Sequence, residues 1–206
     1  MNTRPWLWVL VAGFWCGLIV SGIHPKDQFV WFLEVLPALL VFAILTATYR
    51  RFPFTPLIYV LVFVHALILM LGGHYTYAEV PLFEWIKPVF GWTRNNYDKV
   101  GHFMQGFAPV LITREILVRK KVVAKKGWLP AILVLVILGT SAAYELVEWG
   151  VSVATGSAGD SFLGTQGDIW DTQSDMLMCL IGSIVALLLL SKWHDSQMKT
   201  YAGDKS

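Results

Sequence analysis

The sequence predicts an all-α membrane protein, a polytopic bundle of six transmembrane helices with both termini in the cytoplasm. Of the 206 residues, 56% are hydrophobic and only 15% are charged, whereas soluble domains carry about 25% charged residues. Six stretches approach the roughly 20 apolar residues that a membrane-spanning helix needs. Lys and Arg are divided unevenly between alternate connecting segments, which predicts an orientation. We expect residues 1–206 to form a single integral membrane domain.

The predicted helices follow one another with mainly short connections. The first apolar run exceeds the usual signal-peptide core of about 7–15 residues, and no small-residue cleavage site follows it, so we interpret it as a retained helix. The fourth span is the most polar, because it contains His102, Arg114 and Glu115, but it is needed to separate two connections of opposite charge character. The six expected spans are 6–23, 29–48, 57–73, 100–118, 129–153 and 174–193.

Orientation follows from the positive residues, which concentrate on the cytoplasmic side of membranes. Eleven of the sixteen Lys and Arg residues fall in the N-terminus, the second and fourth connections and the C-terminal tail. Segment 155–173 contains neither Lys nor Arg, so we expect it outside. The opposite set of segments holds only Lys26, Lys87, Arg94 and Lys99.

The longest external connection, 74–99, is too rich in aromatic residues for a free loop. We expect it to lie on the membrane surface or to fold over the bundle, with an interfacial helix through 82–89. The polar tail at about 200–206 is predicted to be disordered.

Ionisable residues inside a membrane are costly and are functional candidates by default. The predicted topology places nine of them at the outer end of the bundle. The last three helices each present two of these residues three or four positions apart, so each pair shares a helix face. The nine residues are Glu34, His74, Asp98, His102, Glu145, Glu148, Asp168, Asp171 and Asp175.

These residue types suit either a divalent metal such as Zn²⁺, Mn²⁺ or Mg²⁺, or a proton relay and general acid/base chemistry. Several carboxylates buried together require a metal, protonation, or a counter-charge from Lys99 or a histidine. The shared site requires His102, Glu145 and Asp175 to lie within about 10 Å of one another. The catalytic candidates are Asp98, His102, Glu145, Glu148, Asp171 and Asp175, and the candidate metal ligands are His74, His102, Glu145, Asp171 and Asp175.

Purely structural roles remain open for several of these residues. Asp98 can act as a helix cap, and Glu34 can hydrogen-bond the backbone that Pro37 leaves free. His65 stands alone in an apolar helix, where a packing role is favoured.

The cytoplasmic half contains few polar groups. Arg114 and Glu115 are interpreted as an interfacial pair, and His24 and His194 as loop residues without a role. This scarcity argues against a polar path through the whole membrane.

Several other classes of site are not indicated. Cys16 and Cys179 lie inside apolar runs and are expected to be buried free thiols, without a disulfide or a cysteine-based metal site. The glycines of 156–159 and 164–167 are not followed by the Lys of a phosphate-binding loop. We expect no organic cofactor and no nucleic-acid partner, and the lipid bilayer as the principal surrounding.

The sequence Asp98-Lys99-Val100-Gly101-His102 resembles the D-K-x-x-H element of VanZ-like membrane proteins. Glu145 resembles the start of their E-x-x-Q element, with Glu148 in place of Gln, and 171–175 resembles their final acidic element with altered spacing. This resemblance covers about 97–186. Over its whole length the chain is similar to the YjdF-like family of bacterial inner-membrane proteins, which implies a bacterial inner-membrane location. Neither resemblance implies a defined reaction.

Two classes of function follow from these observations. The first is a membrane protein without catalysis that handles a small molecule or a lipid-linked molecule of the envelope, as a binder, a transporter subunit or an envelope-stress factor. The second is a metal-assisted membrane enzyme acting on such a substrate from the outer leaflet. A one-sided cluster of polar residues is expected of both.

Overall fold

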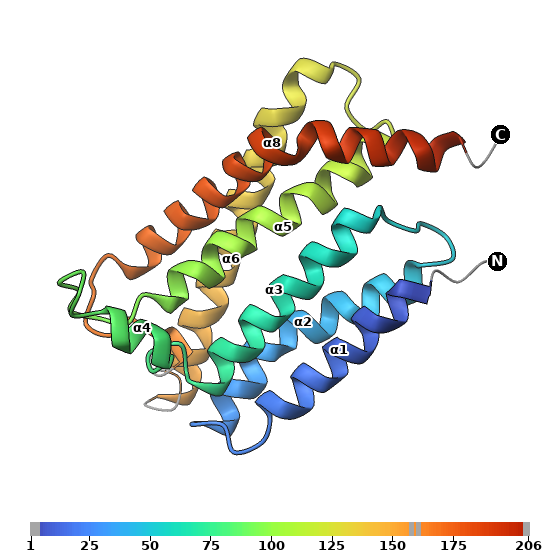
Figure 1. Ribbon diagram of the computed structural model, residues 1–206. Helices are drawn as coiled ribbons and strands as arrows, with labels where there is room; N and C mark the ends of the chain where they lie inside the picture. The colour runs from blue at the N-terminus through green and yellow to red at the C-terminus, as the bar shows by residue number, and fades with distance from the viewer. Residues whose placement is uncertain (1–4, 157–158, 160–161, 204–206) are drawn as a thin grey trace.

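The computed structural model describes residues 5–156, 159 and 162–203, and these form an all-helical protein (Figure 1). Within them there are seven α-helices, a short 3-10 turn at Lys126–Trp128 and no β-strand, so the predicted all-α class is confirmed. The helices are α1 (Pro5–Ser21), α2 (Gln28–Thr48), α3 (Pro56–His74), α4 (Pro81–Ile86), α5 (Tyr97–Arg119), α6 (Leu129–Thr155) and α8 (Asp171–Gly203).

The long helices run back and forth, which gives the bundle two ends (Figure 1). At one end, here called the α4 end, α1, α3 and α6 finish and α2, α5 and α8 begin. At the other end, here called the terminal end, α1 begins and α8 finishes. Of the nine polar residues predicted at the outer end of the bundle, eight lie in helices, each in the half nearer the α4 end, and Asp168 lies just before α8.

Among the described residues, four helices are long and apolar enough to cross a membrane: α2, α3, α6 and residues Asp171–Thr200 of α8. The described part of α1 is apolar but has only 17 residues, and α5 has 23 residues but a more polar sequence. Large apolar side chains such as Leu135, Leu146 and Leu188 are exposed on the helices. Such a surface is unfavourable in water and suits contact with lipid chains.

Helices α5 and α8 extend farthest beyond the spans expected from hydropathy. α5 begins at Tyr97, so Asp98 and His102 share one helix face, as their spacing predicts. α8 has 33 residues and is about 50 Å long, well beyond a bilayer core of about 30 Å. Helix α8 continues to Gly203 through part of the tail predicted to be disordered, and 204–206 lie outside the described residues.

α5 is at the centre of the bundle and packs against α3, α6 and α8, while α3 also holds α1 and α2. The approach of α5 to α8 is unusually close. A Cβ atom added to Gly106 would lie 1.8 Å from the carbonyl oxygen of Cys179, and one added to Gly182 would lie 2.0 Å from that of Phe103. Small residues allow such close backbone contact between membrane helices. This contact fixes the two helices that carry most of the site.

The two cysteines differ in exposure. Cys179 is buried and unpaired as predicted, but Cys16 is exposed, so its predicted burial is wrong. α1 buries Phe14 against α2 and α3, and this leaves Cys16 on the outer side of the helix.

A buried network of polar side chains lies near the terminal end of the bundle. The Glu115 carboxylate accepts hydrogen bonds from Thr55 at 2.8 Å and Arg119 at 2.5 Å, and lies 2.9 Å from His194 Nε2. The expected Arg114–Glu115 pair is therefore wrong. His194 is not a loop residue but a fully buried member of α8. Arg114 instead pairs with Asp195 at 2.9 Å.

Candidate functional site

Arg94, which the sequence analysis treated only as a charge, is the centre of an ion-pair network at the α4 end. It lies just before α5 and is only 8% exposed. Its guanidinium forms ion pairs with Asp98 on α5 and Asp171 on α8, and Asp168 lies 3.5 Å away. Burial disfavours the charged guanidinium, but the neighbouring carboxylates Asp98 and Asp171 outweigh it and raise the pKa of Arg94.

Lys99 supplies a second cation to the same network. Its Nζ atom lies 2.8 Å from Oδ1 of Asp171 and 2.8 Å from Oδ1 of Asp175. The prediction that Lys99 provides counter-charge is therefore confirmed. Asn96, not Asp98, is the residue that precedes α5, and Asp98 is part of the network instead of acting as a cap. These ion pairs join the start of α5 to the start of α8.

His102, Glu145 and Asp175 meet although they belong to α5, α6 and α8. His102 Nδ1 lies 3.8 Å from Glu145 Oε1, and His102 Nε2 lies 3.7 Å from Asp175 Oδ1. One ligand atom from each residue lies within 4.8 Å of the other two, a spacing that one metal ion can bridge. The Oε1 atom of Glu145 is buried and has no hydrogen-bond partner in the part of the chain that the structure describes.

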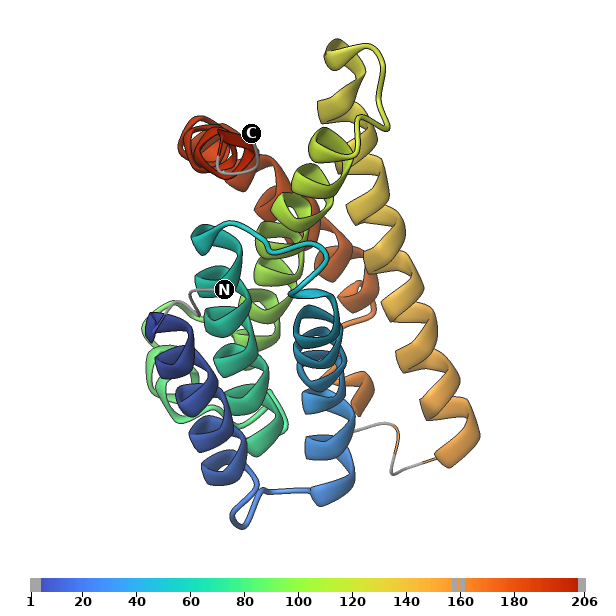
Figure 2. The ribbon, with the colours of Figure 1, turned by 90° about the vertical axis from the view of Figure 1, so that its right-hand side faces the viewer.

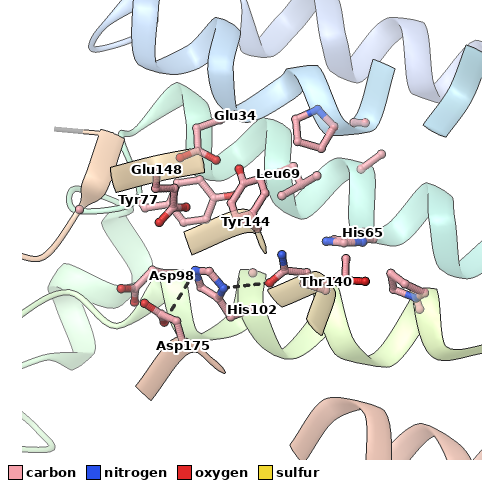
Figure 3. A pocket seen from close by; sticks show the side chains of 18 of the residues that line it. Glu34, His65, Leu69, Tyr77, Asp98, His102, Thr140, Tyr144, Glu148 and Asp175 are labelled. Atoms are coloured by element: carbon pink, nitrogen blue, oxygen red, sulfur yellow. Dashed lines mark hydrogen bonds and ion pairs between the residues drawn. The ribbon is translucent and has the colours of Figure 1, made fainter. Parts of the chain in front are cut away.

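Two more carboxyl groups approach each other from α2 and α6 (Figure 3). Glu34 is 7% exposed and Glu148 is 6% exposed. Neither forms an ion pair with Lys or Arg within the described residues. Burial and the nearby Glu34 charge raise the pKa of Tyr77 well above its usual value, so its neutral phenol can donate a hydrogen bond to Glu34.

A cavity of about 240 Å³ lies between Glu34 and Glu148 on one side and His102 and Asp175 on the other (Figure 3). Phe162 and Leu163 line it from the segment before α8. Its inner part is lined by apolar side chains, including Val41, Val62 and Ile112. The cavity is therefore amphipathic, with its polar part toward the α4 end. The polar lining consists mainly of Glu34, Tyr77, Asp98, His102, Tyr144, Glu148, Asp171 and Asp175.

The chain matches a family model described as "Predicted membrane protein (DUF2238)" over residues 6–196. The chain belongs to this family. It is also 47% identical, over 184 residues, to the inner membrane protein YjdF of Escherichia coli (strain K12), a match that covers 89% of this chain and 88% of the relative. No solved structure is a significant match. The resemblance of 97–186 to VanZ-like proteins is not shown by these matches.

Membership of the DUF2238 family makes the chain a membrane protein, and the exposed apolar faces of its helices contact the lipid bilayer. Neither the family description nor the relative's name states a reaction, a ligand or a metal.

His74 is a sequence candidate that the fold does not bring into the cluster. Its Nδ1 atom lies 2.8 Å from the carbonyl oxygen of Ser21, and its ring packs edge-on against Tyr75. Two groups of ligand atoms converge among the described residues, one from His102, Glu145 and Asp175 and one from Asp98, Asp171 and Asp175, and His74 belongs to neither. It connects the ends of α1 and α3 instead.

Other residues enter the site without having been proposed from the sequence. Tyr144 and Thr140 line the cavity with Glu148, a spacing of four that places all three on one face of α6. That spacing was the signal available in the sequence. His65 also lines the cavity, and its Nε2 atom is buried without a partner, so it is not the satisfied packing residue expected.

Proposed function

We propose that this chain is a multi-pass inner-membrane protein whose amphipathic cavity binds a small molecule of the cell envelope or the head of a lipid-linked molecule. In this proposal, Glu34, His102 and Glu148, which line the cavity, contact the ligand. The paired residues Arg94 and Lys99 hold the surrounding helices in place.

The proposal includes six transmembrane helices, with both termini in the cytoplasm and the α4 end in the periplasm. Among the described residues, ten Lys and Arg residues lie toward the terminal end and four toward the α4 end, which supports this orientation. The segment 74–99 then lies at the outer membrane surface. Exposure of Trp85 and Val89, at 80% and 78%, supports an interfacial position for this segment.

The observation that carries the binding proposal is the set of buried carboxyl groups around one cavity. A buried charge is unfavourable unless it is paired or hydrogen-bonded. Asp98, Asp171 and Asp175 have Arg94 and Lys99 as partners. No Lys or Arg among the described residues pairs with Glu34 or Glu148, which also line the cavity. A ligand that donates hydrogen bonds to these groups would satisfy them.

Analysis of co-purified molecules tests the binding proposal. The protein is purified in detergent and extracted with organic solvent, and the extract is compared by mass spectrometry with that of the Glu148→Gln variant. We expect one species to fall about tenfold, because a hydrogen bond to a charged group is lost. Glu84→Gln is the matched control, since Glu84 lies on α4 outside the cavity. Identical extracts from all three proteins would show the proposal to be wrong.

A metal-assisted membrane enzyme is the second candidate. The convergence of His102, Glu145 and Asp175 within 4.8 Å favours it, together with the unpartnered Oε1 atom of Glu145. A divalent ion at this position would polarise a substrate or activate a bound water. Lys99 already pairs with Asp175, so metal binding requires this ion pair to rearrange.

Elemental analysis distinguishes the two candidates. Protein purified without chelator and equilibrated with Zn²⁺ or Mn²⁺ is expected to retain about one ion per chain if the site binds metal. Glu145→Gln is expected to lose this ion, whereas Glu79→Gln, an exposed residue outside the cluster, is expected to keep it. Metal-free wild-type protein would exclude the enzyme candidate and leave the binding proposal standing.

A further inference from the structure

We infer that the cavity opens sideways into the bilayer between α2 and α6, and that its ligand is an amphiphile with an amine head group. This inference rests on the proposed function, because it names the chemical class of the ligand and its route into the same cavity.

The lateral opening follows from two helices that line the cavity without packing closely on each other. α2 lines it from Glu34 to Val41, and α6 lines it from Thr140 to Glu148, in each case along one helix face. Figure 2 shows these helices standing apart at the α4 end, and direct packing between them is slight. Thr140 lies near the middle of α6 and is exposed although it lines the cavity. The cavity therefore reaches the protein surface at the depth of the lipid chains.

The cavity volume limits what can be enclosed. About 240 Å³ is less than the roughly 300–1,000 Å³ of pockets that enclose drug-sized ligands. A complete lipid does not fit, but a head group and the first part of a chain do. The apolar lining at Val41, Val62 and Ile112 suits methylene groups. The remainder of the tail then passes between α2 and α6 into the bilayer.

The polar part of the cavity selects the head group. Glu34 and Glu148 offer carboxyl oxygens from opposite sides, and neither has a Lys or Arg partner among the described residues. Arg94 and Lys99 are paired with aspartates and do not line the cavity. An amine supplies both the missing positive charge and hydrogen-bond donors, whereas a phosphate would be repelled by the carboxylates.

Aromatic rings support the same assignment. Tyr77 and Tyr144 lie beside the two carboxyl groups in the cavity (Figure 3). The face of an aromatic ring attracts a cation within about 6 Å. The head group is accordingly placed between Glu34 and Glu148.

Photocrosslinking in lipid nanodiscs tests this inference. The probes are hexadecylamine, hexadecanol and hexadecanoic acid, each with a diazirine on the same chain carbon. We expect the amine probe to label cavity-lining residues of α2 and α6 about tenfold more than the other two. Equimolar butylamine, which is water-soluble and lacks a long chain, is expected not to compete.

Two sets of variants separate the parts of the inference. The double variant Glu34→Gln, Glu148→Gln is expected to reduce amine labelling about tenfold and to abolish the preference for amine over alcohol. Thr140→Trp fills the opening between α2 and α6 and is expected to reduce labelling by all three probes. Leu135→Trp is its matched control, since Leu135 is exposed on the same helix and does not line the cavity. Thermal unfolding verifies that each variant is folded.

The outcomes are distinguishable. Equal labelling of the Thr140→Trp and Leu135→Trp proteins overturns lateral entry. Preference for alcohol or acid, or unchanged selectivity in the double variant, overturns the amine head group. Competition by butylamine overturns the need for a chain. These results leave the proposed function in place if Glu148→Gln still loses a co-purified molecule. The proposed function itself fails if the extracts of wild type, Glu148→Gln and Glu84→Gln are identical.

Discussion

Lys99 on α5 and Asp175 on α8 form an ion pair with a distance of 2.8 Å between Nζ and Oδ1. The same two helices make close backbone contact deeper in the bundle, where Gly106 lies against Cys179. Charge pairing at the α4 end and close packing farther in therefore fix the relative position of two helices that together present His102 and Asp175 to the cavity.

Removal of Lys99 is expected to destabilise the fold. Lys99→Met leaves Asp171 and Asp175 buried with less counter-charge, which should cost about 3 kcal/mol in free energy of unfolding. Unfolding titrations in mixed micelles measure the difference. Lys26→Met is the control, because the Lys26–Glu79 pair is exposed and should contribute less than about 1 kcal/mol. Equal effects of the two variants would contradict the structural role of Lys99.

Gly106→Ala is expected to separate α5 from α8. The new Cβ would lie 1.8 Å from a backbone oxygen, so the helices must move apart at a cost of about 1–3 kcal/mol. Gly139→Ala on α6 meets no atom within 4 Å and is expected to cause no loss of stability. The yield of folded protein and the thermal midpoint of both variants are the measurements. A stable Gly106→Ala protein would disprove the close contact.

Glu115→Ala is expected to destabilise the terminal end. The substitution removes the acceptor of Thr55 and Arg119 and the partner of buried His194, which should cost about 3–5 kcal/mol. Asp195→Ala breaks only the more exposed pair with Arg114 and should change stability by less than about 1 kcal/mol. Comparison of the two unfolding free energies checks the prediction, and a larger effect at Asp195 would reverse it.

The α4 segment provides a pH test. Hydrogen bonds from Lys87 and Asn95 lower the pKa of Glu84 below its usual 4.5. A carboxyl with a lowered folded pKa stabilises the fold above the usual value, and this contribution is lost as pH falls through the lowered one. Glu84→Gln should therefore be less stable than wild type at pH 7, by a small amount because the site is partly exposed, and the difference should shrink below about pH 4.5. A difference in thermal midpoint that grows in acid would contradict this.

Reporter fusions test the proposed orientation. Green fluorescent protein fused after residue 206 is expected to fluoresce, because it remains in the cytoplasm. Alkaline phosphatase inserted within 155–173 is expected to be active, because this segment without Lys or Arg is proposed to face the periplasm. The opposite pattern, with phosphatase active only at the C-terminus, would invert the topology.

The sequence by itself determined the helices and the grouping of residues within each helix. Long apolar runs and spacings of three or four positions are local properties, so they predicted the helical class and the shared face of Asp98 and His102. Hydropathy also indicated a membrane protein. It misjudged the ends of α5 and α8, because helices continue past the apolar region wherever polar partners satisfy them.

Only the tertiary structure decided which helices meet and which faces they turn to one another. Arg94 became the centre of a network, and Glu115 met His194, 79 positions away, through contacts that no local spacing encodes. His74 was excluded from the cluster for the same reason. When a helix is apolar on nearly every side, hydropathy does not indicate its rotation about its axis. That rotation is set by close packing at positions such as Gly106 and by pairing of the few buried charges.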